Sequence, residues 1–201
     1  MLLDIQPWLV FCTLIILSAS FVQGVTGFGF ALVSLPLLTQ FLPLRQVVPL
    51  IVILSFMTNI AILLNCYKHI VFRKISLLIL AGITAAPFGS GLLLYVDDTA
   101  LKIAAGILIA LFAAVMLTGW TAPVRNERLG FVAVGLASGL LNGSISMSGP
   151  PVALFLSNQG MDKQTFRANL TLYALVLNAV TIASYYITVY WIRRFPAPYY
   201  G

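Results

Sequence analysis

Charge is what this 201-residue sequence has least of: Asp, Glu, Lys and Arg make up only 8% of it, and just five residues are acidic. Apolar residues make up 61%, and the mean hydropathy is +1.03. Such a chain cannot fold around one soluble core, so the composition indicates an integral membrane protein. The alternating ten-residue segments of a membrane barrel are also missing, which leaves transmembrane helices.

Several motifs of enzymes are absent as well. The chain has no nucleotide-binding GxxxxGK[ST] loop, no HExxH pair, and no Asp or Glu inside an apolar segment. ATP hydrolysis, intramembrane metalloproteolysis and a carboxylate proton relay therefore have no support. No nucleophile, base and orienting group form a plausible array, so we predict a protein that is not an enzyme and has no catalytic residue, metal or cofactor.

Cysteine is scarce, and the first residues lack positive charge. Cys12 and Cys66 have no CxxC spacing and no His companion, so we interpret both as small core residues. Residues 1–7 contain no basic residue, and no small-residue cleavage site follows. We therefore expect no cleaved signal peptide.

What charge there is gives a net +6, gathered in short clusters between apolar segments. Basic and aromatic residues do not alternate as in a nucleic-acid groove, so no nucleic-acid partner is expected. Under the positive-inside rule the clusters face the cytoplasm, and the acidic stretch 95–99 lies on the other side. The clusters are Lys68, His69, Arg73 and Lys74; Arg125 and Arg128 with Glu127; and Arg193 with Arg194.

Six apolar segments are expected to span the bilayer: 8–40, 47–67, 75–95, 101–120, 129–157 and 166–192. They alternate consistently if the N-terminus is cytoplasmic, in a bacterial inner membrane. Basic residues on the two expected outer loops are exceptions to this assignment, namely Arg45, Lys163 and Arg167.

The first and fifth segments are too long for a simple span, and both contain glycines and a proline. We interpret them as the broken first helices of two copies of a four-helix unit, residues 8–120 and an incomplete second copy at 129–201. An even number of spans per copy predicts two parallel copies. Either the chain is truncated, or a partner supplies the missing pair of spans. The expected matches are Gly24 with Gly139, Gly27 with Asn142, Pro36 with Pro151 and, after a short insertion, Asn59 with Asn178.

Broken helices in hydrocarbon leave backbone groups unpaired, which is tolerated only inside protein or beside a polar cavity. Matching breaks in two copies therefore predict a substrate site near the bilayer midplane. The order Ser148-Gly149-Pro150-Pro151 is typical of a helix start, whose free amides suit a small anion. Hydroxyls of Ser144, Ser146 and Ser148 could add donors. The alternative is that these small residues only allow close helix packing.

Three further polar residues have two interpretations each. Arg167, just inside the sixth segment, could pair with an oxyanion or extend to the interface. Asn59 and Asn178 could orient the substrate or join helices by hydrogen bonds.

Three stretches carry a resemblance: GVTGFGFALVSLPLL from Gly24, GLLNGSISMSGPPVALFL from Gly139 and FRANLTLYALVLN from Phe166. Together they resemble the sulfite exporter TauE/SafE family, over nearly the whole chain. The resemblance implies a permease of about eight helices in two repeats, associated with sulfite, sulfoacetate and other sulfonates, with its site between the broken segments. Phe28 and Phe30 stand where many members have glycines, which bears on substrate size and identity. The chain also stops before the last two spans of the pattern.

The predicted function is therefore permeation of a small anion. Both breaks are expected to contact the anion at the site, and rocking of the two copies moves it from one face of the membrane to the other. The partners expected are this anion and the lipid bilayer, and association with a second copy of the chain is left open. The alternative is a non-transporting membrane subunit whose breaks dock a partner helix. The predicted substrate-binding residues are Gly24, Gly27, Phe28, Gly29, Phe30, Asn59, Asn142, Ser144, Ser146, Ser148, Gly149, Arg167 and Asn178.

Overall fold

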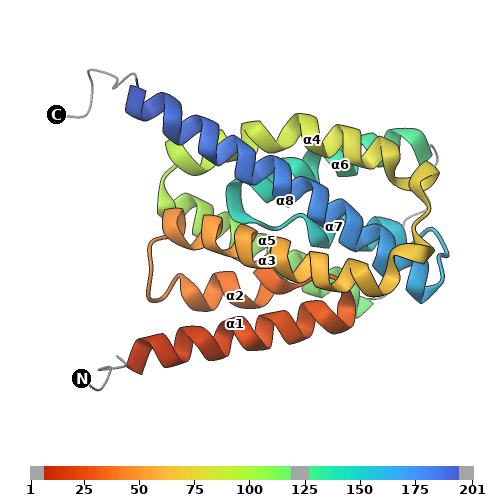
Figure 1. Cartoon of the computed structure of the whole chain (residues 1–201), viewed down its shortest axis with the longest axis horizontal. Coiled ribbons are helices and arrows are strands. Elements are labelled where there is room, and N and C mark those ends of the chain that lie inside the picture. The colour runs from red at the N-terminus through yellow and green to blue at the C-terminus, as the bar shows by residue number, and fades with distance from the viewer. Residues whose placement is uncertain (1–6, 119–126, 195–201) are drawn as a thin grey trace.

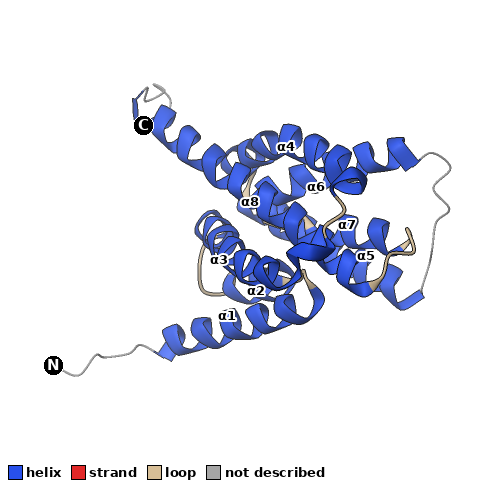
Figure 2. Cartoon of the chain, turned by 45° about the vertical axis from the view of Figure 1, so that its right-hand side comes forward, coloured by secondary structure: helices blue, strands red, loops and turns tan. Residues whose placement is uncertain are grey.

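The computed structural model describes residues 7–118 and 127–194, and this part of the chain contains helices and no strand (Figure 2). Six of the described helices, α1, α3, α4, α5, α6 and α8, are long and apolar enough to cross a membrane. The predicted all-helical membrane class is thus confirmed. Trp120 and Arg125 lie outside the described residues. The elements are α1 (Pro7–Thr26), α2 (Phe30–Leu38), α3 (Leu44–Cys66), the 3-10 helix η1 (Tyr67–His69), α4 (Phe72–Tyr95), α5 (Asp98–Thr118), α6 (Glu127–Ile145), α7 (Gly149–Ser157) and α8 (Lys163–Arg194).

The predicted break in the first segment is present, but the chain reverses there instead of continuing across the membrane. The end of α1 lies beside the start of α8, because a Cβ on Gly27 would come 3.6 Å from the Cα of Arg167. The end of α3 lies there too, since Ile62 and Cys66 pack with Ala168. Helices α1 and α3 therefore run in the same direction, and α2 returns between them as the second arm of a hairpin (Figure 1).

The break in the fifth segment makes a second hairpin of the same kind. Tyr173 and Tyr185 of α8 donate hydrogen bonds to the carbonyls of Gly135 and Gly143 of α6, in the same order along both helices. Helices α6 and α8 are therefore parallel, and α7 runs back from the break in contact with both. We call α1–α2 hairpin 1 and α6–α7 hairpin 2.

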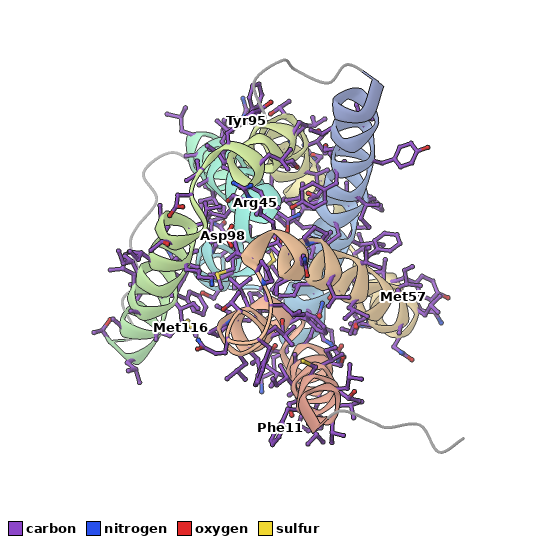
Figure 3. All side chains as sticks on the ribbon, turned by 90° about the vertical axis from the view of Figure 1, so that its left-hand side faces the viewer. Phe11, Arg45, Met57, Tyr95, Asp98 and Met116 are labelled. Carbon is purple, nitrogen blue, oxygen red and sulfur yellow. The ribbon has the colours of Figure 1, made fainter. Side chains whose placement is uncertain are left out.

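Because of these reversals, the charged loops are distributed differently from the six-span prediction. Arg45 pairs with Asp98 at 3.6 Å, on the face where α1 and α3 begin (Figure 3). At the other end, the backbone N–H of Val71 donates to Asn169 of α8 at 2.9 Å. Lys163 and Arg167 thus share a face with the Lys68–Lys74 cluster, and the start of α1 lies on the opposite face. We call the face made by residues 67–74, 127–128 and 158–167 the basic face.

Helices in the first part of the chain and their counterparts in the second part begin at a constant separation in sequence. Gly149 follows Phe30 by 119 positions, and Lys163 follows Leu44 by the same number. This register matches Gly24 with Gly143, one helical turn beyond the predicted Gly139, and needs no insertion before Asn59 and Asn178. The matched helices α3 and α8 are antiparallel, so the expected parallel relation is wrong. The physical reason is that hairpin 1 begins and ends on one face, so only α3, α4 and α5 cross the membrane in the first unit. An odd number of crossings makes the second unit start from the opposite face.

Glycines account for the closest helix contact, between α4 and α6. A Cβ on Gly135 would lie 2.7 Å from the Leu78 carbonyl oxygen, and one on Gly139 or Gly143 would overlap the carbonyls of Gly82 and Ala86. Four-residue spacing of small residues is the usual means by which membrane helices approach at backbone distance. The packing interpretation therefore holds for Gly139.

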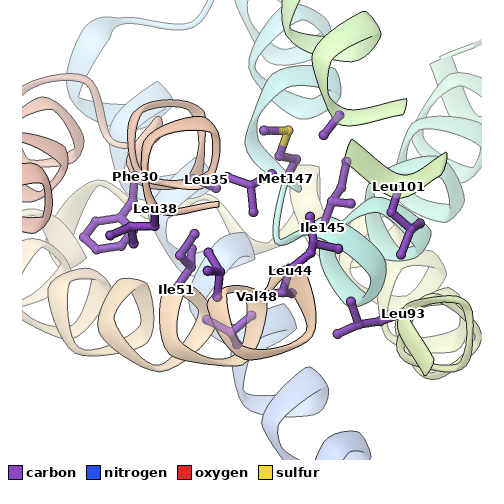
Figure 4. Packing of buried hydrophobic residues seen from close by; sticks show 14 of the residues in the cluster. Phe30, Leu35, Leu38, Leu44, Val48, Ile51, Leu93, Leu101, Ile145 and Met147 are labelled. Carbon is purple, nitrogen blue, oxygen red and sulfur yellow. The ribbon is translucent and has the colours of Figure 1, made fainter. Parts of the chain in front are cut away.

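The largest buried cluster lies where hairpin 1, α3 and the tip of hairpin 2 meet. Leu35 and Leu38 of α2 and Leu44 and Val48 of α3 are at most 2% exposed, and Met147 packs into the same cluster (Figure 4). At the periphery, large apolar side chains point outward, as lipid-facing residues do. Examples are Phe11, Met57 and Met116 (Figure 3).

Candidate functional site

The tips of the two hairpins meet inside the protein. Hairpin 1 turns at Gly27–Gly29 and hairpin 2 at Ser146–Ser148. A Cβ on Gly149 would lie only 3.1 Å from the Cβ of Phe28. Because hairpin 1 enters from the face where α1 begins and hairpin 2 from the basic face, the two tips approach each other from opposite sides.

The tip of hairpin 1 depends on glycine. Gly27 and Gly29 have φ of 84° and 102°, which are left-handed values that residues with a Cβ rarely adopt. The Thr26 side chain closes the turn through hydrogen bonds with the backbone N–H and carbonyl of Phe28. The turn itself is thus closed by contacts within the sequence Thr-Gly-Phe-Gly.

The tip of hairpin 2 is held by backbone and serine contacts. Ser146 has φ of 58°, and it is the one non-glycine residue with positive φ in the described part of the chain. Its N–H donates to the Asn142 carbonyl, and that of Met147 donates to Leu141. The Ser138 hydroxyl donates to the Ser148 carbonyl at 2.8 Å, which ties the tip back to α6.

A cavity of about 30 Å³ lies between the tips. That volume holds one or two water molecules. None of the described residues around it is charged. It is lined by Gln23, Phe28, Gly29, Phe30, Ala31, Leu32, Ser55, Ser146, Met147, Ser148, Gly149, Pro150 and Ala174. We call it the central cavity.

Both short helices direct their N-termini to this cavity, since α2 begins at Phe30 and α7 at Gly149. The first N–H groups of a helix have no acceptor within it, and the helix dipole is positive at that end. Pro150 and Pro151 carry no N–H, so α7 offers fewer amides than α2, where Phe30, Ala31 and Leu32 all line the cavity. The arrangement provides positive potential and donors without a formal charge, as suits a small anion.

The structure brings together six of the predicted site residues and not the other seven. Those that line the central cavity are Phe28, Gly29, Phe30, Ser146, Ser148 and Gly149. Those outside its lining are Gly24, Gly27, Asn59, Asn142, Ser144, Arg167 and Asn178.

Asn59, Asn142 and Ser144 form hydrogen bonds within and between the helices around the cavity. Asn59 accepts a hydrogen bond from Gln23 at 2.6 Å, and Asn142 donates to Thr181 at 2.9 Å. Each keeps one buried amide atom without a partner, Nδ2 of Asn59 and Oδ1 of Asn142. Ser144 donates to Leu140 within its own helix, and Asn178 is 2% exposed within α8.

Arg167 lies behind the tip of hairpin 1 instead of facing the central cavity. Its guanidinium donates to the Gly24 carbonyl, and a Cβ on Gly27 would meet its side chain at 3.0 Å. Gly24 and Gly27 therefore contribute to the site by holding the hairpin against α8.

Two polar lining residues were missed by the sequence reasoning. Gln23 donates to Ser55 at 3.2 Å as well as to Asn59, and both Gln23 and Ser55 reach the cavity. A buried Gln inside an apolar segment was the available signal. Within residues 7–118 and 127–194, no three His, Cys, Asp or Glu side chains are grouped as metal ligands.

Comparison with known proteins gives one result. The family model described as Sulfite exporter TauE/SafE matches residues 12–197. Neither the curated proteins nor the solved structures that were searched contain a match.

Proposed function

The chain belongs to the sulfite exporter TauE/SafE family, and on that premise we propose that it carries sulfite or a small sulfonate through the central cavity by alternating access. Members of this family are membrane transporters of sulfite or related anions, and six candidate spans agree with that class. The anion and the mechanism are the parts that we propose.

The observation that carries the proposal is the convergence of two helix N-termini on one cavity. Helices α2 and α7 enter from opposite faces and both begin at its wall. A sulfite or sulfonate head has three oxygens, each of which can accept an N–H or O–H donor. Backbone amides of α2 and the hydroxyls of Ser146 and Ser148 supply donors of that kind.

An inverted pair of hairpins supports exchange between the faces. The constant separation of 119 positions and the antiparallel course of α3 and α8 fit two units of opposite orientation, as in inverted-repeat transporters. A cavity of about 30 Å³ is closed to an oxyanion, so one tip must withdraw for the anion to enter. Withdrawal of hairpin 1 opens one face, and withdrawal of hairpin 2 opens the other.

The charge distribution supports an orientation in a bacterial inner membrane. Lys68, Arg73, Arg128, Lys163 and Arg167 lie on the basic face, whereas Arg45, Lys102 and the end of α8 with Arg193 and Arg194 lie on the opposite face. The third basic cluster is therefore not on the same face as the other two, and the positive-inside rule favours the basic face as cytoplasmic through the larger number of basic residues there. The N-terminus would then be external, opposite to the expectation from six alternating spans. Accessibility of a cysteine introduced at Lys68 to an impermeant thiol reagent in intact cells measures this directly.

The test of the proposed transport is flux in vesicles. The purified chain in proteoliposomes should carry radiolabelled sulfite or methanesulfonate, and Ser148→Ala should raise the KM about tenfold, the cost of one lost hydrogen bond to a charged group. Ser144→Ala is the matched control, because the Ser144 hydroxyl already donates to Leu140 and lies outside the cavity lining.

Two outcomes would contradict the proposal. Equal KM values in Ser148→Ala and Ser144→Ala would show that the Ser148 hydroxyl does not bind the anion. Absence of flux for every small anion tested, in protein that is folded by circular dichroism, favours a non-transporting subunit.

A further inference from the structure

A second, larger cavity opens on the basic face. Its volume is about 440 Å³, compared with about 30 Å³ for the central cavity. The end of hairpin 2, the start of α8 and the end of α1 form its walls. It is lined by Val25, Thr26, Ser157, Met161, Lys163, Gln164, Phe166 and Arg167.

The lining combines cationic and apolar side chains. Lys163 and Arg167 both line it, none of its described lining residues is acidic, and Val25, Met161 and Phe166 are its large apolar residues. The nearest acid in sequence, Asp162, interacts with the side chain of Thr165 and accepts hydrogen bonds from its backbone N–H, and both contacts lower the pKa of the Asp162 carboxyl. Its carboxylate therefore serves the start of α8.

The stability of α8 does not explain the two cations. Lys163 and Arg167 are four residues apart, so they share one side of the helix and repel each other. They also occupy the first two turns, where the helix dipole disfavours positive charge. An anion placed between them would relieve both effects.

Arg167 connects this cavity with the tip of hairpin 1. Its guanidinium donates to the Gly24 carbonyl, while its buried Nε has no hydrogen-bond partner. Thr26 lines the larger cavity and Phe28 lines the central one. The turn from Thr26 to Phe28 is therefore the wall between the two cavities.

We propose that the larger cavity is a binding site for a small organic oxyanion, an alkanesulfonate in chemical class, held by Lys163 and Arg167 before it passes the tip of hairpin 1. The ammonium and guanidinium groups donate to the oxyanion. The alkyl part lies against Val25, Met161 and Phe166. The hydroxyls of Thr26 and Ser157 already donate to backbone carbonyls, so they are not counted as donors. The choice of anion rests on the proposed function, whereas the existence of the site does not.

The test uses charged thiol reagents on the purified full chain in lipid nanodiscs. Gln164→Cys introduces an exposed thiol in the cavity, and Asn65→Cys introduces one at the same face at the end of α3, outside the lining. The native Cys12 and Cys66 are buried and give the background. Relative to Asn65→Cys, Gln164→Cys should prefer the anionic methanethiosulfonate reagent over its cationic analogue by about tenfold.

Two further measurements complete the test. Methanesulfonate should slow labelling of Gln164→Cys and not of Asn65→Cys. Adding Lys163→Gln should reduce the anionic preference several-fold, whereas Lys68→Gln, the same change on the same face outside the cavity, should leave it unchanged. Equal reagent preference at both cysteines, or no protection by methanesulfonate, overturns the site.

The outcome is separable from that of the transport assay. If Gln164→Cys prefers the anionic reagent and is protected by methanesulfonate, but the vesicles show no flux, then the site is supported and the proposed transport is rejected. Flux without preference or protection rejects the site and keeps the transport. If both hold, Lys163→Gln should raise the KM for methanesulfonate several-fold at an unchanged maximal rate, and Lys68→Gln should alter neither.

Discussion

The two hairpin tips make the same reversal with different residues. Hairpin 1 uses Gly27 at φ 84°, and hairpin 2 uses Ser146 at φ 58°, 119 positions later. A residue with a Cβ costs about 1–2 kcal/mol in this region, and glycine does not carry that cost. The strain at Ser146 persists beside the central cavity, whose wall includes this residue. Strain kept at such a place favours a role in binding over a role in folding.

The first helices of the two hairpins, α1 and α6, also differ in their use of glycine, but here the glycines matter in hairpin 2. Helix α6 packs backbone-to-backbone on α4 through Gly135, Gly139 and Gly143, whereas a Cβ on Gly24 would meet nothing within 4 Å. Hairpin 2 is therefore anchored to α4 along its first arm. Hairpin 1 is held near its tip through Arg167, so we expect it to be the more mobile of the two.

The largest effect is expected from a methyl group placed on the anchored arm. In Gly143→Ala the new Cβ overlaps the Ala86 carbonyl and the backbone of Ser90, so α4 and α6 must separate, at a cost of about 3 kcal/mol or more. Gly24→Ala, its counterpart, should be neutral or stabilising by up to about 1 kcal/mol. The midpoint of thermal unfolding in detergent measures both. Equal losses would show that the two arms are packed alike.

A smaller effect is expected at the glycine tip. In Gly27→Ala the backbone is strained at φ 84° and the new Cβ lies 3.0 Å from Cγ of Arg167, which together cost about 2 kcal/mol. Because Arg167 also holds Gly24, we expect the sulfite flux to fall together with stability. Gly91→Ala, where a Cβ would meet nothing within 4 Å and the φ is ordinary, is the control. Unchanged stability in Gly27→Ala would mean that the tip adapts without glycine.

The breaks could be predicted from sequence because Gly, Ser and Pro are conspicuous in an apolar segment. Gly27, Gly29, Ser146 and Gly149 all lie at the tips, as expected. The reversal was not predicted, although the segment 8–40 would be ~50 Å long as one helix, well beyond the ~30 Å of a bilayer core. Length alone does not separate a tilted broken span from a hairpin. The contact of Gly24 with Arg167, 143 positions apart, decides between them, and no local pattern encodes it.

The role of individual glycines and of Arg167 was equally undetermined by the sequence. Gly139 pairs with Gly24 by local composition, yet its place against Gly82 is set by the crossing of α6 with α4. Arg167 suits an oxyanion by chemistry, and only the packing of α8 against hairpin 1 assigns it to the larger cavity. Residue type restricted the chemistry of both, and tertiary packing decided which cavity or helix each one serves.

The smallest expected effect would make the serine tip resemble the glycine tip. Ser146→Gly relieves the left-handed strain, partly offset by the larger entropy of the unfolded chain, so we expect a net gain of about 0.5 kcal/mol in unfolding free energy. The hydroxyl leaves the central cavity at the same time, so the KM for sulfite should rise several-fold while the protein becomes more stable. Ser184→Gly, in α8 and outside the lining of both cavities, is the control for serine removal. A lower KM, or a loss of stability, would show that Ser146 is retained for folding, and the difference between the two tips would then have no bearing on the anion.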